Sequence, residues 1–241
     1  MQATPALRLH TGQPRLPSAK NALNRLLRPK PFFALHNIHS PQRRALETYV
    51  AQQFDCAYGA TITEFLPELV SMQCQGRFSA VAGIRPALDG DLFVEKYLDE
   101  PLERTLGRLS STSVSRSDIV EIGNLVSTHR GACQLFFMLH ATVLCEAGFK
   151  WAVFAATDQV EKIINKLNFV TFDLGAADPA RLGEDAARWG RYYDTGPAVR
   201  AADLAATVSQ FRQSPLSAAA ITFFSDTIAE LARSIRIRPF Q

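Results

Sequence analysis

The run Asp118-Ile-Val-Glu-Ile-Gly-Asn-Leu-Val126 decides how the rest of the chain is interpreted. Its length and apolar residues are typical of a buried strand, and a helix is expected to start just beyond it. Glu121 stands between apolar neighbours, where lost hydration raises the pKa of a carboxylate toward the range that suits a general base. Upstream, Val81-Ala-Gly-Ile-Arg85 places an arginine at the end of a second apolar strand. Together these residues indicate a site for moving an acyl group.

The alternation of a strand places Glu121 and Gly123 on one face and Asn124 on the other. A bulge at Gly123 would instead bring Glu121 and Asn124 to the same side. Glu121 has two readings, a general base or the partner of a buried arginine, which would lower its pKa. Arg85 likewise could hold a substrate carboxylate, or it could be the structural partner of Glu121 or Glu95. The residues alone leave these alternatives open.

The segment after the strand has features of an anion site. Backbone amides at a helix start bind phosphate, basic side chains add donors, and glycine allows close approach. The candidates for binding the phosphates of an acyl donor are Ser127, Thr128, His129, Arg130 and Gly131. An ordinary capped helix is the alternative interpretation.

The cysteines offer one further candidate. Cys133 stands early in the helix, where a lowered thiol pKa would suit an acyl-accepting nucleophile, although small buried cysteines are common. Cys56, Cys74, Cys133 and Cys145 form no C-x-x-C pair, and with the five histidines they give no zinc spacing. We therefore expect no metal, and reduced thiols fit a cytoplasmic protein.

Aromatic residues gather in Trp189-Gly-Arg-Tyr-Tyr-Asp194. Trp189, Tyr192 and Tyr193 could line a substrate pocket or supply a phenolic acid. Packing at the edge of the core, with the polar tips in water, is the alternative.

The charge is distributed unevenly. The 241 residues carry a formal charge of +3, yet residues 1–46 contain eight Lys or Arg and no Asp or Glu. A basic arm on a mildly acidic body indicates an anionic partner, such as an acidic acyl-carrier protein. A solvated, flexible tail is the alternative, membrane contact is not favoured, and no nucleic acid is expected. Neither a signal peptide nor an apolar run long enough to cross a membrane is seen, so we expect a cytoplasmic protein.

The order of elements predicts the fold class. Expected strands cover residues 31–38, 68–74, 78–84, 118–126, 150–156 and 169–174; expected helices cover 42–54, a stretch ending at Gly148, and 158–167. Ser40-Pro41 is expected to cap the first helix, and residues 91–109 to mix short helix and loop. This order predicts an α/β fold with a mixed central sheet, helices on both faces and further C-terminal helices. We expect a basic, flexible arm over 1–30, a main domain over 31–200 and a helical extension over 201–241.

Several blocks together resemble the thermostable hemolysin family across roughly residues 32–200. They are Val-Ala-Gly-Ile-Arg85, Leu92 to Glu103, Val114-Ser-Arg-Ser117, Ile-Val-Glu-Ile-Gly-Asn-Leu125 and Trp189-Gly-x-Tyr-Tyr193. That family is similar to N-acyl-homoserine-lactone synthases, which have a GNAT-like fold. The resemblance matches Arg85 to a conserved arginine, Phe93 to an aromatic of the crossover and Glu121 to a strand glutamate. Where the synthases have Ser-Arg, this chain has Gly123-Asn124.

The resemblance implies an N-acyltransferase that moves a fatty acyl group to an amino acid-like amine. The donor would be acyl-CoA or the phosphopantetheine of acyl-carrier protein. Glu121, Arg85 and Asn124 are the candidate catalytic residues, and Phe93 joins the aromatic pocket. Two other classes stay open: a membrane-active hemolysin with no catalytic role, and a GNAT-like binding module without catalysis.

Overall fold

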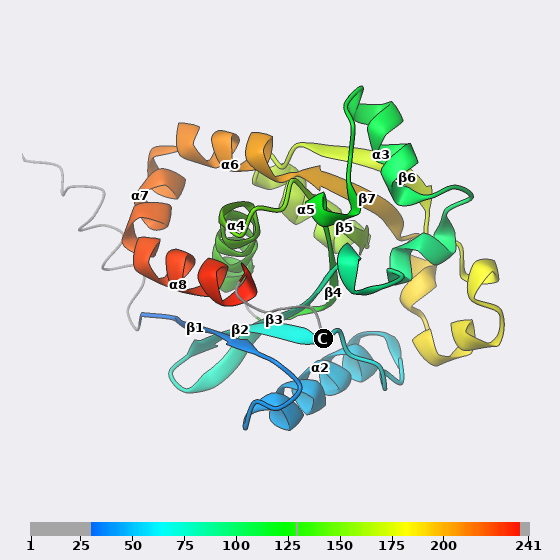
Figure 1. Ribbon diagram of the computed structural model, residues 1–241. Coiled ribbons are helices and arrows are strands. Elements are labelled where there is room, and N and C mark those ends of the chain that lie inside the picture. The colour runs from blue at the N-terminus through cyan, green and yellow to red at the C-terminus, as the bar shows by residue number, and fades with distance from the viewer. Residues whose placement is uncertain (1–29, 129, 237–241) are drawn as a thin grey trace, which may run out of the picture.

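The computed structural model describes residues 30–128 and 130–236, and its centre is a seven-stranded sheet (Figure 1). The strands are β1 (Phe32–His36), β2 (Glu68–Cys74), β3 (Arg77–Pro86), β4 (Ile119–Ser127), β5 (Trp151–Ala156), β6 (Thr171–Ala176) and β7 (Ala198–Asp203). Their order across the sheet is β1-β2-β3-β4-β5-β7-β6. Among these seven described strands, β4 and β5 pair in parallel and the other neighbours are antiparallel. The mixed α/β sheet is therefore confirmed.

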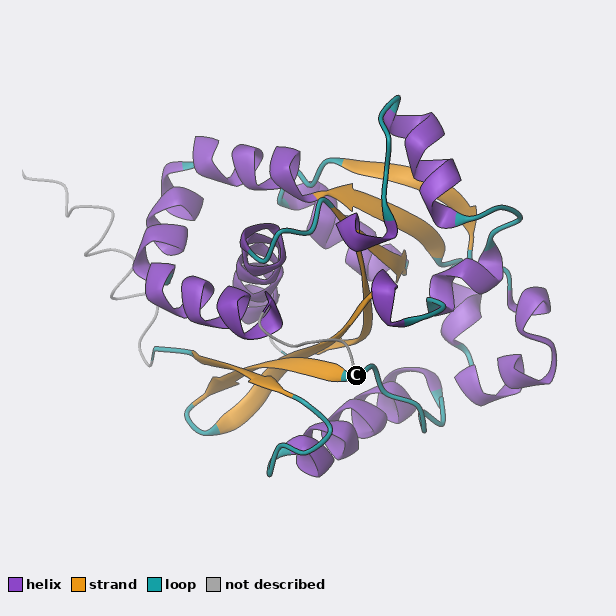
Figure 2. Ribbon diagram, viewed as in Figure 1, coloured by secondary structure: helices purple, strands orange, loops and turns teal. Residues whose placement is uncertain are grey.

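Helices cover both faces of the sheet (Figure 2). The α-helices are α2 (Arg43–Tyr58), α3 (Leu102–Ser110), α4 (Arg130–Glu146), α5 (Asp158–Lys166), α6 (Leu204–Gln213), α7 (Pro215–Phe223) and α8 (Ser225–Arg236). Short 3-10 helices are η1 (Ala87–Asp89), η2 (Phe93–Tyr97), η3 (Arg116–Asp118), η4 (Pro179–Trp189) and η5 (Tyr192–Thr195). The helices α6, α7 and α8 form an arc around α4 on one face, as Figure 1 shows.

The apolar pattern of the sequence accounts for this layering. On the face of α4, Phe136, Leu139 and Leu144 pack with residues of the sheet in one core cluster. On the other face, a second cluster joins α2 to β2, β3 and β4, and a third joins α3 and η2 to β5 and β7. A sheet with apolar side chains on both faces needs helices on both, which is the arrangement found.

Two local expectations differ from the structure. The helix α2 begins at Arg43 and not at residue 42, and Ser40-Pro41 does not cap it, because the Ser40 hydroxyl is engaged in a turn with Asn37. The strand β7 was not predicted, and it occupies residues 198–203, so helix begins only at Leu204. The sequence Ala-Ala-Asp has weak strand propensity, and its pairing with β5 and β6 supplies the stability. Of the expected basic arm, residues 1–29 lie outside the described residues.

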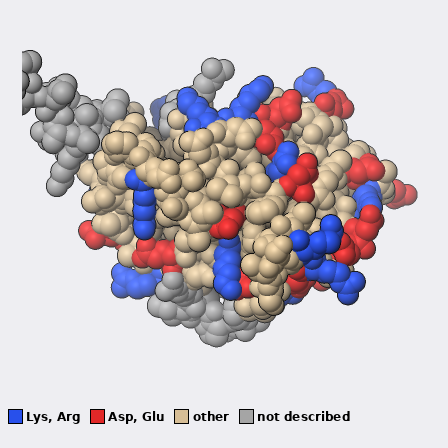
Figure 3. Space-filling model, turned by 90° about the horizontal axis from the view of Figure 1, so that it is seen from above, with Lys and Arg blue, Asp and Glu red and all other residues tan. Residues whose placement is uncertain are grey.

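The surface gives little sign of a charged partner on the face drawn in Figure 3. Basic and acidic side chains lie next to one another there, around a broader uncharged area. In the part of the chain that the structure describes, no helix combines the length and the apolar character needed to cross a membrane.

The strands β4 and β5 separate soon after they meet. They pair only from Ile119 opposite Trp151 to Glu121 opposite Val153. Beyond Glu121, β4 continues beside β3 while β5 continues beside β7. The sheet therefore opens between its two central strands, directly after the glutamate.

Candidate functional site

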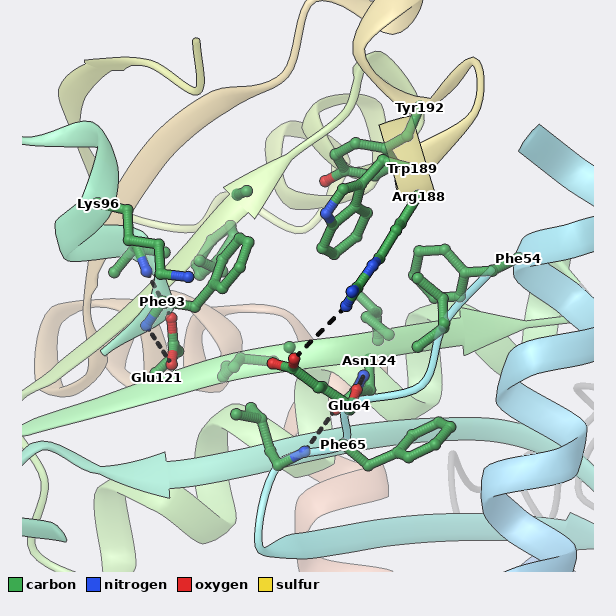
Figure 4. A pocket seen from close by; sticks show the side chains of 18 of the residues that line it. Phe54, Glu64, Phe65, Phe93, Lys96, Glu121, Asn124, Arg188, Trp189 and Tyr192 are labelled. Atoms are coloured by element: carbon green, nitrogen blue, oxygen red, sulfur yellow. Dashed lines mark hydrogen bonds and ion pairs between the residues drawn. The ribbon is translucent and has the colours of Figure 1, made fainter. Parts of the chain in front are cut away.

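A pocket of about 210 Å³ lies at this opening (Figure 4). Its walls come from β4 between Glu121 and Leu125, from the end of β5, from the loop 61–66, and from η2 and η4. The pocket thus combines residues from distant parts of the sequence. It is lined mainly by apolar and aromatic side chains with a few polar groups among them, as ligand pockets usually are.

Glu121 is a buried carboxylate in the wall of this pocket, with only 2% of its surface exposed. Its carboxylate accepts the backbone N–H of Phe93 at 3.0 Å and that of Val94 at 2.8 Å (Figure 4). Burial raises the pKa of Glu121, and the two N–H groups oppose that rise without cancelling it. Each carboxylate oxygen keeps a further lone pair, so the group can still accept a proton or a donor from a ligand.

Arg85 lies directly opposite Glu121 in the pairing of β3 with β4. Its guanidinium donates to the Asp91 carbonyl at 3.2 Å, and Arg85 also lines the pocket. The alternative of a pair with Glu95 does not hold, because Glu95 is bound by Arg116 at 2.7 Å. Arg85 therefore supplies a positive charge close to Glu121 without a close ion pair to Glu95.

A bulge in β4 brings Asn124 to the pocket. Val81 pairs with Val126 and Gly83 with Gly123, so Asn124 and Leu125 together face the single residue Ala82. Asn124 has a φ of +48°, which asparagine tolerates better than most residues. The bulge lies one residue beyond the position suggested by Gly123. Glu121 and Asn124 consequently line the same pocket.

The side chain of Asn124 holds the loop 61–66. Its Oδ1 accepts the Leu66 N–H at 2.8 Å, and its Nδ2 donates to the Glu64 carbonyl at 3.2 Å. From the other side, Arg43 donates to the Leu66 carbonyl at 2.7 Å. Both amide groups of Asn124 are thus used by backbone, which makes it a residue that positions the pocket wall.

The packing of Leu66 accounts for the glycines at positions 83 and 123 of the strands β3 and β4. A Cβ built on Gly83 would lie 2.8 Å from the Leu66 Cβ, and one built on Gly123 would lie 3.0 Å from its Cδ1. At Gly83 a side chain would force Leu66 to move, and at Gly123 it would make a tight contact with the end of the leucine. Leu66 and Arg43 were not identified from the sequence, since Arg43 was counted with the basic arm and Leu66 carries no reactive group.

The aromatic residues form the far wall. Phe93, Trp189 and Tyr192 line the pocket, and the rings of Phe93 and Trp189 are 5.5 Å apart. Tyr193 is not among the lining residues, because its hydroxyl is turned to that of Tyr97 at 2.5 Å. Burial raises the pKa of Tyr192 and of Tyr193, so both phenols are neutral at physiological pH.

Charged side chains stand at the rim. Lys96 lies over the Phe93 ring with its Nζ 4.8 Å from the ring centroid. Arg188 approaches Glu64 at 4.0 Å and Asp185 at 3.7 Å, linking η4 to the loop 61–66 (Figure 4). Cations and carboxylates are therefore both present where a ligand would enter.

Of the predicted donor-binding segment, the structure describes the side chains of Ser127 and Thr128. Ser127 ends β4, and the Thr128 N–H donates to the Ser79 carbonyl at 3.0 Å. Neither residue is among those that line the pocket. Arg130 begins α4 and Gly131 follows in its first turn, while His129 lies outside the described residues.

Cys133 does not have the lowered pKa that an acyl-accepting nucleophile would need. It is 7% exposed, and burial raises the pKa of its thiol because desolvation disfavours the thiolate. Among the described residues, no three His, Cys, Asp or Glu side chains come together as a metal site would need.

The architecture is that of the GNAT-like synthases. The apo structure of TofI superposes with a TM-score of 0.53 at 12% identity, covering 77% of this chain and 99% of the other. FeeM, an N-acyl amino acid synthase from uncultured soil microbes, gives 0.50 at 16% identity, covering 75% and 95%. BjaI, a CoA-dependent acyl-homoserine lactone synthase with SAM and isopentyl-CoA, gives 0.50 at 8% identity, covering 76% and 88%. The fold is thus shared with acyltransferase enzymes.

The family is also established. The model of the thermostable hemolysin family matches residues 36–208, which is more than half of the chain. The chain therefore belongs to the thermostable hemolysin family. No curated protein sequence matches it.

Proposed function

We propose that this protein is an N-acyltransferase that moves a fatty acyl group from a thioester donor to an amino acid-like amine. The observation that carries the proposal is the buried Glu121 carboxylate, with its raised pKa, in the pocket where β4 and β5 diverge. The likeness in fold to FeeM and BjaI supports the reaction class.

In the proposed reaction, the amine nitrogen attacks the thioester carbonyl of the donor. A C–N bond forms, the C–S bond breaks, and the thiolate leaves. Glu121 takes the proton of the amine, directly or through a water, and the Phe93 and Val94 N–H groups keep its carboxylate oriented while it does so. A base with a raised pKa accepts that proton more readily than an ordinary exposed glutamate.

The acceptor would be held by charge. Arg85 and Lys96 bring positive charge to the lining of the pocket, and a carboxylate on the acceptor would be attracted to them. Phe93 and Trp189 give the acceptor an apolar wall. Asn124 would act by holding the loop 61–66 in place.

The donor would enter between the strands. Beyond Glu121, β4 has no partner strand on the side of β5, so backbone groups beside the opening can bond an extended pantetheine arm. The donor would be acyl-CoA or the phosphopantetheine of an acidic acyl-carrier protein. Its phosphates would meet the helix start from Ser127 to Gly131, with His129 and Arg130 as donors.

The test is the Glu121→Gln variant with dodecanoyl-CoA and dodecanoyl-carrier protein as donors and a mixture of amino acids as acceptors. We expect N-acyl amino acid and free thiol from the wild type and a loss of about 10²- to 10⁴-fold in kcat/KM for the variant. Glu100→Gln is the matched control, because Glu100 forms a surface pair with Arg108. Undiminished transfer by a folded Glu121→Gln variant would remove Glu121 as the base.

The family description favours a second candidate, a membrane-active hemolysin. Lysis would then be direct, or it would follow from an acylated, surfactant-like product. Dye release from anionic liposomes by the purified protein without any acyl donor would favour the direct role. Failure to bind both acyl-CoA and acyl-carrier protein would favour a binding module without catalysis.

A further inference from the structure

A histidine without partners lies beneath the candidate site. His140, on α4, is 6% exposed, and neither of its ring nitrogens has a hydrogen-bond partner among the described residues. Its ring stacks on Phe136 with the centroids 5.5 Å apart and the planes 17° from parallel. A neutral imidazole offers one donor and one acceptor, and leaving both unpaired in the core costs stability. Such an orphan is expected to have a ligand or a functional reason.

The His140 ring lines a small cavity of about 30 Å³ whose other walls are apolar. Three of those walls, Ile122, Leu125 and Phe154, also line the main pocket. Ile122 and Leu125 belong to β4 and Phe154 to β5, so the shared wall spans the place where the strands diverge. An extended chain that leaves the main pocket between the strands would run toward α4 and His140.

We propose that His140 helps to select the acyl chain of the donor, favouring acyl chains that carry a hydroxyl group. This inference rests on the acyltransferase function proposed above. A hydroxyl can accept from one ring nitrogen or donate to the other, whereas an unsubstituted chain fills the same space and leaves both nitrogens unpaired. Rotation about the bond to the imidazole has broad, roughly two-fold preferences, so either nitrogen can be presented to the cavity.

A bound water is the competing occupant. A cavity of this size holds a water only if polar partners are available, and His140 is the polar residue that lines it. If a water satisfied the ring permanently, hydroxylated and plain chains would bind equally well. The two cases therefore differ in a measurable ratio of affinities.

The experiment measures binding of dodecanoyl-CoA and of its monohydroxylated positional series by calorimetry. We expect one position of the hydroxyl to improve the Kd of the wild type about tenfold, equivalent to about 1.4 kcal/mol. The His140→Phe variant keeps the stacked ring, and we expect it to lose this preference while still binding the plain chain. Phe137→Leu is the control, since Phe137 lines the same cavity and its change should shift all affinities together.

Equal binding of the plain chain and every hydroxylated chain would overturn the role of His140 and leave the proposed function intact. Retention of the preference in His140→Phe would also overturn it. Failure of all the acyl-CoA probes and of acyl-carrier protein to bind would remove both proposals. If His140→Phe does not fold, the ¹⁵N resonances of the His140 ring in the wild type decide. Their chemical shifts should change when the preferred hydroxylated chain binds and should not change when the plain chain binds.

Discussion

The side-chain Oδ1 of Asn124 accepts the backbone N–H of Leu66 at 2.8 Å, across 58 positions of sequence. This bond joins the bulge in β4 to the loop that forms one wall of the pocket. Leu66 in turn occupies the space left by Gly83 and Gly123. The Gly123-Asn124 pair, which separates this chain from the homoserine lactone synthases it resembles, is thus explained by the way the loop is held.

Asn124→Gly should loosen this wall. Glycine accepts the positive φ of the position, so the change removes the amide without adding backbone strain. Because the Leu66 N–H loses its partner, we expect the free energy of unfolding to fall by about 1–2 kcal/mol in urea titrations. Limited proteolysis should cut the loop 61–66 faster. Asn124→Asp keeps the acceptor for Leu66, and equal losses in both variants would contradict this account.

Gly123→Ala should crowd Leu66, and Leu66→Ala should relieve the crowding. The added methyl would come within 3.0 Å of the Leu66 Cδ1, an atom that Leu66→Ala removes, and such overpacking costs about 1–3 kcal/mol. In a double-mutant cycle we expect the combined variant to be more stable than the sum of the single changes predicts. Strictly additive free energies of unfolding would show that the two residues do not compete for space.

Gly190→Ala should damage the aromatic wall. The glycine has a φ of +53°, and a Cβ there would lie 2.3 Å from the Tyr58 carbonyl oxygen. Gly183→Ala is the matched control, because its φ of +57° and ψ of −130° are close to the +53° and −124° of Gly190, but a Cβ there would meet nothing within 4 Å. Both variants carry the cost of the same backbone conformation, so the difference between their melting temperatures measures the clash. We expect Gly190→Ala to melt several degrees lower, and equal melting temperatures would refute the close approach.

The rate of acyl transfer should depend on the ionisation of Glu121. Burial raises the pKa of Glu121 above its ordinary 4.5, and only the ionised form can accept the amine proton. We therefore expect kcat/KM to rise with pH, with a midpoint above 4.5 after correction for ionisation of the amine. Glu121→Gln should remove this rise of kcat/KM with pH. A rise that persists unchanged in the variant would show that another group titrates.

Stability at acidic pH should depend on His140. Burial lowers the pKa of His140 from 6.5 to about 4, so below pH 6.5 the unfolded chain binds a proton that the folded chain does not. The contribution of neutral His140 to the free energy of unfolding is fully present above pH 6.5 and is lost as the pH falls toward 4. At about 1.4 kcal/mol per pH unit, the wild type should lose about 3 kcal/mol more than His140→Phe over this range. Parallel curves of unfolding free energy against pH would contradict a buried, neutral ring.

Local patterns were enough to predict much of the fold. The apolar run of β4, the hairpin of β2 and β3 and the stripe of α4 were recognised because period and turn residues are properties of short segments. The strand β7 escaped because Ala-Ala-Asp resembles helix, and only pairing with β5 and β6 makes it a strand. Glu121 and Arg85 were identified as candidate site residues because each places a charged group at an informative position of an apolar strand, whereas Phe93 was implied by the family resemblance.

What the sequence by itself determined was the fold class, the family and the glutamate at the centre of the candidate site. The tertiary structure alone decided that β4 bulges at Asn124, that Leu66 packs onto two glycines, and that the sheet opens after Glu121. It also turned the Tyr193 hydroxyl toward Tyr97 and left the ring nitrogens of His140 without a hydrogen bond among the described residues. These features depend on contacts between residues far apart in the chain. Such contacts have no local period, because their geometry is fixed only when the helices pack on the sheet.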